Sequence, residues 1–240
     1  MSREEFINEL ILLGIRITRD QLDKLQQYMD FLVTYNQHTN LTTITNEEDI
    51  YLKHFYDSLT IAKYVDLKNT NNLLDIGTGA GFPGMVIKIL FPNIKVTLLD
   101  SNNKKITFLK VLSQVLDIDV ELVNDRAEDY INDKREHYDF VVSRAVAPLP
   151  VLLELAIPFV KVGGLFVAMK ANVNEELKKS NNTPKLLGSK LKSINEFNLI
   201  KEDSLRTIII YEKESKTDNK YPRQFDKIKK KPLWLVWFFI

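Results

Sequence analysis

The chain has 240 residues, which is enough for one large α/β domain with a small extension. Hydrophobic residues make up 45% and charged residues 27%, as is ordinary for a globular protein, and the absence of cysteine excludes disulfides, thiolate metal sites and cysteine nucleophiles. The net charge of +1 provides no global field for nucleic acid, so any RNA binding must come from a local basic patch.

The first 66 residues have a helical pattern. Apolar residues recur every three or four positions over residues 6–17 and again over residues 22–33, which predicts two amphipathic helices. The polar stretch 35–43 is rich in Asn and Thr and predicts a loop, and residues 47–64 return to helical spacing. No signal peptide and no apolar run of membrane-spanning length is apparent, so we expect a cytoplasmic protein with no membrane partner.

Two of the three histidines, His38 and His54, lie in this region. They lack the spacing of metal ligands on one helix face, and no carboxylate cluster accompanies them, so we expect no metal site. The simpler interpretation places His38 in the loop and pairs His54 with Asp57 through a hydrogen bond along one helix face.

A glycine-rich segment, residues 71–84, follows the helical region, and the rest of the chain is organised around it. Residues 73–76 predict a short apolar strand, the alternating glycines of residues 77–81 predict a sharp turn, and Pro83 suits the first position of a helix. A strand, a glycine turn and a helix N-terminus together make a nucleotide-binding site at the carboxyl end of a parallel sheet.

Two nucleotide motifs overlap in this segment. The register from Gly79 to Gly84 matches the dinucleotide fingerprint G-x-G-x-x-G. The register Asp75-x-Gly77-x-Gly79-x-Gly81 resembles the first motif of S-adenosylmethionine-dependent methyltransferases. A carboxylate near the turn would repel a pyrophosphate but can help to hold the ammonium of a methionine moiety, which favours the second register. A turn with only a structural role is the remaining alternative.

Residues 95–99 predict the second strand, which ends at Asp100. An acidic residue at this place can accept both hydroxyls of an adenosyl ribose. NAD enzymes use the same device, so Asp100 indicates a nucleoside without specifying the cofactor. The alternative is an ordinary helix N-cap, because a helical pattern follows.

Strands and helices alternate in the rest of the chain, which predicts an α/β fold with a mostly parallel sheet covered on both faces. We expect helices at residues 104–116 and 150–160, a short helix opening at 124–129, helix and loop at 172–192, and strands at 119–123, 137–142, 165–169 after a glycine turn, 197–200 and 205–211. We divide the chain into a helical extension (1–66), a core (67–213) and a basic C-terminal tail (214–240). The last seven residues, 234–240, are wholly apolar and too short to span a bilayer, and they suggest no function.

Taken in order, the motifs resemble the family of glucose-inhibited division protein B, the small-subunit ribosomal RNA guanine-N7 methyltransferases. The resemblance runs from about residue 5 to Leu233, and the combination is more specific than the glycine motif alone. It is carried by Tyr35-Asn36 with Asn40-Leu41-Thr42, His54-Phe-Tyr-Asp57-Ser58-Leu59, residues 74–84, Arg126-Ala127-Glu128, residues 143–148, and the tail from Tyr221-Pro222-Arg223 to Lys231-Pro232-Leu233. The apolar end departs from the family pattern.

The resemblance implies a Rossmann-like, seven-stranded methyltransferase sheet with an N-terminal helical extension. It implies an enzyme that uses S-adenosyl-L-methionine to methylate N7 of a guanine in small-subunit (16S) ribosomal RNA. Its partner would be that RNA or the small subunit itself, and we expect a monomer. Cofactor contacts are implied at Gly77, Phe82, Ala127, Glu128 and Arg144, to which the residue-level argument adds Asp75, Gly79 and Asp100. A salt bridge from Arg144 to Asp75 or Glu128 is an alternative that could coexist with binding.

Guanine N7 carries a free lone pair, so its methylation requires no general base and we assign no catalytic acid or base. Holding N7 in line with the methyl carbon and sulfur can lower a barrier by about 7–11 kcal/mol. The RNA must be held through its phosphates and by stacking on an unpaired base. The candidates for RNA contacts, which could instead be solvated surface charge, are Arg144, Lys170, Arg206, Arg223, Lys229 and Lys230, within a tail whose residues 227–231 are mostly lysine.

Two other classes of function remain open. One is a methyltransferase that acts on a protein or a small molecule, against which the basic tail argues. The other is a non-catalytic nucleotide-binding module, which a comparison of S-adenosylmethionine with NAD binding would separate from an enzyme.

Overall fold

A computed structural model of the chain describes residues 1–233, apart from the side chain of Asp133. The apolar end, residues 234–240, lies outside the described residues. The fold is mixed α/β, and its seven strands belong to one sheet, which confirms the expected fold class. The chain divides into two compact units, one ending at Asn124 and the other beginning at Asp125. The division at residues 66 and 213 stays a prediction.

The beginning of the first unit is helical, as predicted. Its helices are α1 (Arg3–Leu12), α2 (Arg19–Thr39), α3 (Glu47–Asp49), the π-helical η1 (Ile50–Tyr56), α4 (Asp57–Leu59), and the 3₁₀ helices η2 (Thr60–Lys63) and η3 (Leu67–Asn69). Ser2 and Thr18 start α1 and α2 with capping boxes, in which each side chain accepts from a backbone N–H three residues later.

The predicted loop at 35–43 begins later than expected. Helix α2 continues to Thr39, and Asn40 then ends it in the left-handed conformation with φ of 52°. His38 therefore lies in the last turn of a helix, and its placement in a loop was wrong. Asparagine is one of the few residues that reaches this conformation readily, because its short polar side chain bonds locally.

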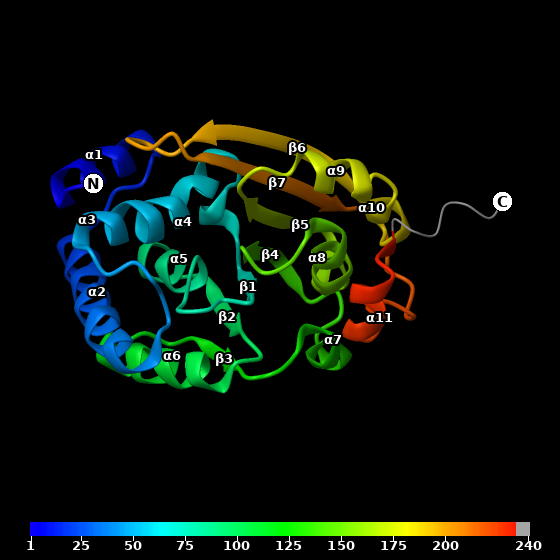
Figure 1. The fold of residues 1–240 in the computed structure, drawn as a ribbon, viewed down its shortest axis with the longest axis horizontal. Helices are drawn as coiled ribbons and strands as arrows, with labels where there is room; N and C mark the ends of the chain where they lie inside the picture. The colour runs from blue at the N-terminus through cyan, green and yellow to red at the C-terminus, as the bar shows by residue number, and fades with distance from the viewer. Residues whose placement is uncertain (234–240) are drawn as a thin grey trace. The chain divides into compact units, whose positions relative to one another are not determined.

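The strands of the first unit are β1 (Asn72–Ile76), β2 (Lys95–Leu99) and β3 (Glu121–Val123), which pair in parallel in the order β3-β2-β1. Two helices accompany them, α5 (Gly84–Leu90) and α6 (Asn103–Val115), and α2 packs against both (Figure 1). The last residues of β1, β2 and β3 face one another in register, so all three carboxyl ends lie at one edge. A nucleotide binds at this edge in parallel sheets.

The second unit contains the other four strands in the order β4-β5-β7-β6. The β4–β5 pair is parallel, whereas β7 runs antiparallel to both β5 and β6. Its elements are α7 (Ala127–Tyr130), η4 (Ile131–Asp133), β4 (Tyr138–Arg144), α8 (Leu149–Ala156), η5 (Ile157–Phe159), β5 (Val160–Lys170), α9 (Asn174–Ser180), α10 (Thr183–Leu186), β6 (Ser189–Asn198), β7 (Leu205–Lys213) and α11 (Phe225–Lys230).

Two strands of this unit begin earlier than predicted. Strand β5 starts at Val160 and includes the glycine pair that the sequence assigned to a turn, with an irregular register opposite β4. A Cβ on Gly164 would lie 2.6 Å from the carbonyl oxygen of Asp139, so the glycine lets the strands approach there. Strand β6 starts at Ser189, where its pairing with β7 begins. The lysines in its first half obscured the strand pattern in the sequence.

Helix α8 is the centre of the second unit. All eight of its residues are buried, and it contacts β5, α7, α9, α10 and α11. In Figure 1 the short helices α9 and α10 and the C-terminal α11 surround it. The described part of the basic tail therefore packs against the body of this unit through α11.

Candidate functional site

The glycine turn that joins β1 to α5 adopts the predicted conformation. Gly77, Gly79 and Gly81 all have positive φ, at 69°, 62° and 102°. A Cβ on Gly81 would lie 2.5 Å from the hydroxyl oxygen of Tyr28, whereas a Cβ on Gly79 would approach only the Gly77 carbonyl oxygen, at 4.0 Å. Gly81 is therefore required by packing, and Gly79 leaves an open approach to the backbone.

Asp75 holds the two ends of this turn together. Its carboxylate is fully buried, and Oδ2 accepts hydrogen bonds from the Thr78 hydroxyl at 2.7 Å and from the Gly84 N–H at 2.8 Å. Gly84 is the first residue of α5, where a negative charge complements the helix dipole. The structure therefore gives Asp75 a role in holding the turn. The contact that we expect between Asp75 and a methionine ammonium stays a prediction.

Asp100 connects the end of β2 to the glycine turn. Its Oδ2 accepts from the Gly79 N–H at 3.0 Å and lies 3.4 Å from the Lys105 ammonium, and its Oδ1 accepts from the Asn102 N–H at 2.8 Å. The N-cap of α6 is Asn102, whose side chain accepts from the Lys104 N–H. The alternative that Asp100 is an ordinary N-cap was therefore wrong.

Phe82 anchors the N-terminal helices to the turn. Its ring stacks with His54 at a centroid distance of 4.3 Å and with Tyr28 at 5.3 Å, and only 5% of the residue is exposed. The Tyr28 hydroxyl donates to the Ala80 carbonyl, and His54 Nε2 lies 3.1 Å from the Thr42 hydroxyl. The helical extension thereby supports the site. A direct contact of Phe82 with the cofactor stays a prediction.

In the second unit, Ala127 and Glu128 open α7 after the end of the third strand. Burial raises the pKa of the Glu128 carboxyl, and the nearby Arg126 guanidinium, 3.8 Å from Oε1, opposes that shift. The guanidinium of Arg126 also lies over the ring of Phe225, 5.5 Å from its centroid. A chain of contacts thus runs from Glu128, a predicted cofactor contact, through Arg126 to Phe225, the first residue of α11.

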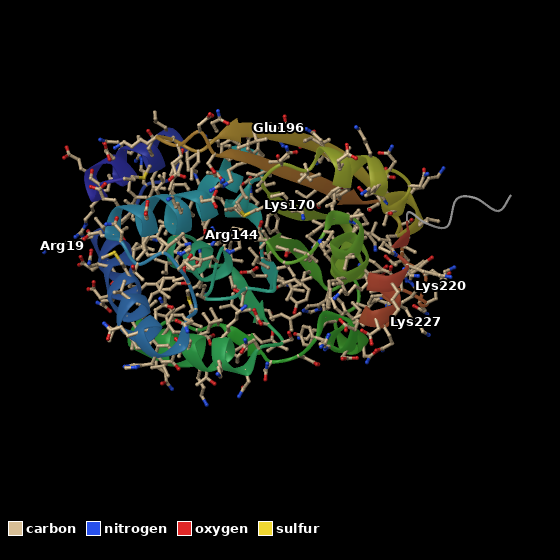
Figure 2. The ribbon with its side chains drawn as sticks, in the orientation of Figure 1. Arg19, Arg144, Lys170, Glu196, Lys220 and Lys227 are labelled. Atoms are coloured by element: carbon tan, nitrogen blue, oxygen red, sulfur yellow. The ribbon has the colours of Figure 1, made fainter. Side chains whose placement is uncertain are left out.

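Arg144 and Lys170 lie at neighbouring strand ends. Arg144 is the last residue of β4, not the position after it as predicted, and it pairs with Met169 in the parallel ladder. Figure 2 labels both side chains. The Lys170 ammonium donates to the Ala147 carbonyl at 2.7 Å and lies 2.7 Å from Glu176 Oε2, with 10% of its side chain exposed. Its charge is therefore already neutralised within the protein.

Arg223 is also paired internally. Its Nε and Nη2 donate to the two oxygens of Glu154, at 2.8 and 2.6 Å, and Glu154 is fully buried in α8. Arg206 donates to the Ser204 hydroxyl and to the Leu205 carbonyl. Lys229 and Lys230 are exposed on α11. The direct RNA contacts stay predictions, and the exposed lysines of α11 are the most accessible of the set.

The structure thus brings Asp75, Gly77, Gly79 and Asp100 into one turn with Phe82 against it, all in the first unit. The second unit holds Ala127, Glu128, Arg144 and the predicted RNA contacts.

The sequence patterns did not reveal which residues support the site, and the structure shows them to be Tyr28, His54 with Thr42, Glu154 and Glu176. These residues stand in motifs or at helical spacing in the sequence. Their hydrogen-bond partners lie up to 69 residues away along the chain, so the sequence pattern could not pair them.

No three His, Asp or Glu side chains among residues 1–233 are grouped so that they could hold a metal ion. In that same part, no helix is both long and apolar enough to cross a membrane.

Comparisons with known proteins identify the family. Residues 21–205 match the family model described as rRNA small subunit methyltransferase G. Ribosomal RNA small subunit methyltransferase G of Bacillus subtilis (strain 168) is 46% identical over 237 residues, which cover 97% of this chain and 99% of that protein. The protein of the same name from Acetivibrio thermocellus is 48% identical over 223 residues, or 92% of each chain.

Solved structures resemble the fold at low identity. Precorrin-6y C5,15-methyltransferase from Geobacter metallireducens GS-15 has a TM-score of 0.52 at 18% identity, covering 72% of this chain and 90% of that one. Fibrillarin from Aeropyrum pernix, in complex with natively bound S-adenosyl-L-methionine, has a TM-score of 0.51 at 13% identity, covering 61% and 68%. Such likeness concerns the fold alone.

Proposed function

Because the chain belongs to the rRNA small subunit methyltransferase G family, we propose that it transfers a methyl group from S-adenosylmethionine to small-subunit ribosomal RNA. The observation that carries the proposal is the 46% identity to a relative of that name across 97% of the chain. The guanine N7 target rests on the motif resemblance. We further propose that the protein acts in the cytoplasm, as a monomer, on this RNA or on the small subunit.

The residues of the first unit fit an adenosyl cofactor. The turn exposes backbone at Gly79, and the Asp100 carboxylate has lone pairs beyond those used by Gly79 and Asn102, so it can accept ribose hydroxyls. Asp75 provides negative charge behind the turn. When bound, S-adenosylmethionine would supply an electrophilic methyl group on a sulfonium leaving group.

The chain's own residues then have two tasks, which are binding and orientation. Guanine N7 needs no base, so no proton has to move and no side chain is assigned to move one. Orientation alone can lower a barrier by about 7–11 kcal/mol. The cofactor-binding role of Ala127, Glu128 and Arg144 belongs to this proposal, supported by their positions at the ends of strands or the start of α7.

For the RNA we propose phosphate contacts from Lys229 and Lys230, because both are exposed on a short helix fixed to the body of the second unit by buried Ile228. Arg206 is a further candidate. Arg223 and Lys170 are each held by a buried or half-buried carboxylate, so direct contacts of these two side chains with RNA stay predictions.

The test is to incubate the protein with methyl-labelled S-adenosylmethionine and small subunits from cells that lack its gene, and then to digest the RNA to nucleosides. Label in 7-methylguanosine supports the proposal. Label in another nucleoside overturns the target base, and label in protein or in no substrate overturns the RNA assignment. Stronger binding of NAD than of S-adenosylmethionine would contradict the cofactor.

A matched pair of glycine variants controls this experiment. Gly77→Val is expected to abolish cofactor binding, because a β-branched residue cannot adopt φ of 69° in the turn without strain. Gly14→Val imposes a similar strain, at φ of 71°, outside the turn, and no atom of residues 1–233 would lie within 4 Å of its Cβ. It should retain cofactor binding. Equal affinity in both variants would contradict the placement of the cofactor at this turn.

A further inference from the structure

The segment that follows β4, residues 145–148, is held by its backbone. It begins directly after Arg144, whose place is set by the pairing of β4 with β5. Ala145 has φ of 56°, a left-handed conformation that costs an L-residue about 1–2 kcal/mol. A strained residue of this kind persists only where the surroundings determine the path of the chain.

Two side chains fix the path of the backbone through this segment. The Lys170 ammonium donates to the Ala147 carbonyl at 2.7 Å, and Glu176 Oε2 accepts from the Leu149 N–H at 2.6 Å. The same Oε2 lies 2.7 Å from the Lys170 ammonium. The contacts therefore form a bracket that runs from the Ala147 carbonyl through the ion pair to the Leu149 N–H, and it closes around Pro148.

Capping of α8 alone does not explain this bracket. Pro148 is the N-cap of α8 and makes no side-chain cap, so the Glu176 carboxylate replaces that cap at the helix N-terminus. A carboxylate can cap a helix without a lysine beside it. Here, however, Lys170 also bonds the Ala147 carbonyl, which precedes the helix. Only 10% of the Lys170 side chain is exposed, which leaves the ammonium little access to a phosphate.

We propose that Lys170 and Glu176 are positioning residues that hold residues 145–148 in the conformation in which this segment can border the target base. The inference rests on the proposed function, because it assigns the carboxyl end of β4 to the reaction. The ion pair acts through the backbone of the segment and touches neither the base nor the cofactor. A displacement of about 1 Å near a reacting centre can lower a rate by about 10²-fold.

The test compares the pair of Lys170 and Glu176 with a second ion pair that lies wholly on α9, the helix of Glu176. Glu175 and Lys178 form an ion pair of 3.1 Å in which both side chains are about three-quarters exposed, at 74% and 75%. Lys170→Met and Glu176→Gln should lower kcat for methyl transfer to the small subunit by at least about tenfold. Both should leave the Kd for S-adenosylmethionine within about twofold of the wild type. The reason is that the bracket holds residues 145–148, which follow the proposed cofactor contact Arg144. Lys178→Met and Glu175→Gln should match the wild type in both quantities.

Two further variants separate positioning from simple stability. Lys170→Arg keeps a cation that can donate to both the Ala147 carbonyl and Glu176, so it should recover most of the kcat lost in Lys170→Met. The double variant Lys170→Met/Glu176→Gln should lose no more than the worse single variant, because both changes release the same segment. Thermal unfolding identifies any variant that fails to fold.

Three outcomes would overturn the inference. One is a kcat in Lys170→Met equal to that of Lys178→Met. Another is weaker RNA binding with a reduced salt slope at unchanged kcat, which would make Lys170 a phosphate contact. The third is unchanged hydrogen exchange at the Leu149 amide in Glu176→Ala, which removes the acceptor, and this measurement needs no substrate. If the wild type labels no RNA, the proposed function fails, whereas the exchange measurement still decides whether the bracket holds the segment.

Discussion

Removal of the Arg223 guanidinium should destabilise the protein, although the residue lies in a surface-facing tail. The perturbation is Arg223→Met, which keeps part of the apolar stem and removes the charge. The partner, Glu154, is fully buried in the middle of α8 and accepts from Nε at 2.8 Å and from Nη2 at 2.6 Å. Among the described residues, only the backbone N–H of residue 223, at 2.9 Å, would remain to bond that carboxylate.

The magnitude follows from the buried charge that the substitution leaves. Breaking one partner of a buried ion pair costs about 3–5 kcal/mol. The lower end applies here, because the Arg223 side chain is 24% exposed and one hydrogen bond to Glu154 survives. In a domain of this size about 3 kcal/mol lowers Tm by about 6–12 °C.

Urea unfolding at neutral pH measures this loss, with Lys220→Met as the matched control. Lys220 also lies in the tail and pairs with Asp218 at 2.9 Å, but both side chains are more than half exposed. Solvent screens such a pair, so the control should unfold at the wild-type urea concentration. The double variant Arg223→Met/Glu154→Leu should recover much of the loss, because no buried charge is left without its partner.

An unfolding midpoint for Arg223→Met equal to that of Lys220→Met, with an unchanged m value, would refute this reasoning. So would a double variant less stable than Arg223→Met alone. A loss of RNA binding in Arg223→Met without any loss of stability would instead restore the direct phosphate contact that the sequence suggested.

Burial lowers the pKa of the Lys213 ammonium to about 8 from 10.5, so the unfolded chain binds this proton more tightly. The stability of the wild type relative to Lys213→Met should therefore rise as pH increases from about 8 to 10.5, by up to about 3 kcal/mol, and a difference that does not depend on pH in unfolding experiments would contradict this. Gly79→Ala should cost about 1–2 kcal/mol in urea unfolding and weaken cofactor binding, because its φ is left-handed. Gly81→Ala should cost more, because its Cβ would also meet the Tyr28 hydroxyl, and equal losses would disprove that clash. Lys229→Gln/Lys230→Gln should reduce the slope of log affinity for RNA against log salt by about 1.4–1.8, and an unchanged slope would remove α11 from the RNA contacts.

Local sequence patterns determined many of the secondary elements and the conformation of the glycine turn. Strand β2 was predicted with its observed ends, and the glycine turn has the positive φ values that its alternating glycines require. These features depend on the backbone freedom of a few adjacent residues, which the chain specifies locally. The family assignment also followed from short motifs, and the relatives at 46–48% identity confirm it.

Local patterns failed where pairing with a distant segment decided the outcome. The glycine pair in β5 has the composition of a turn, yet the strand runs through it, between the pairs that Val160 and Leu165 make with β4. Strand β6 has lysines at alternate positions and became visible only through its register with β7.

The roles of the charged residues also depended on the tertiary structure. From the sequence alone, Lys170 and Arg223 were two cations among 33, and each was a reasonable phosphate contact. The fold places a carboxylate within 2.7 Å of each of them, from residues 6 and 69 positions away along the chain. Charge type is a property of the sequence, whereas the free energy of a charge depends on burial and on the partners that only the folded chain brings near it.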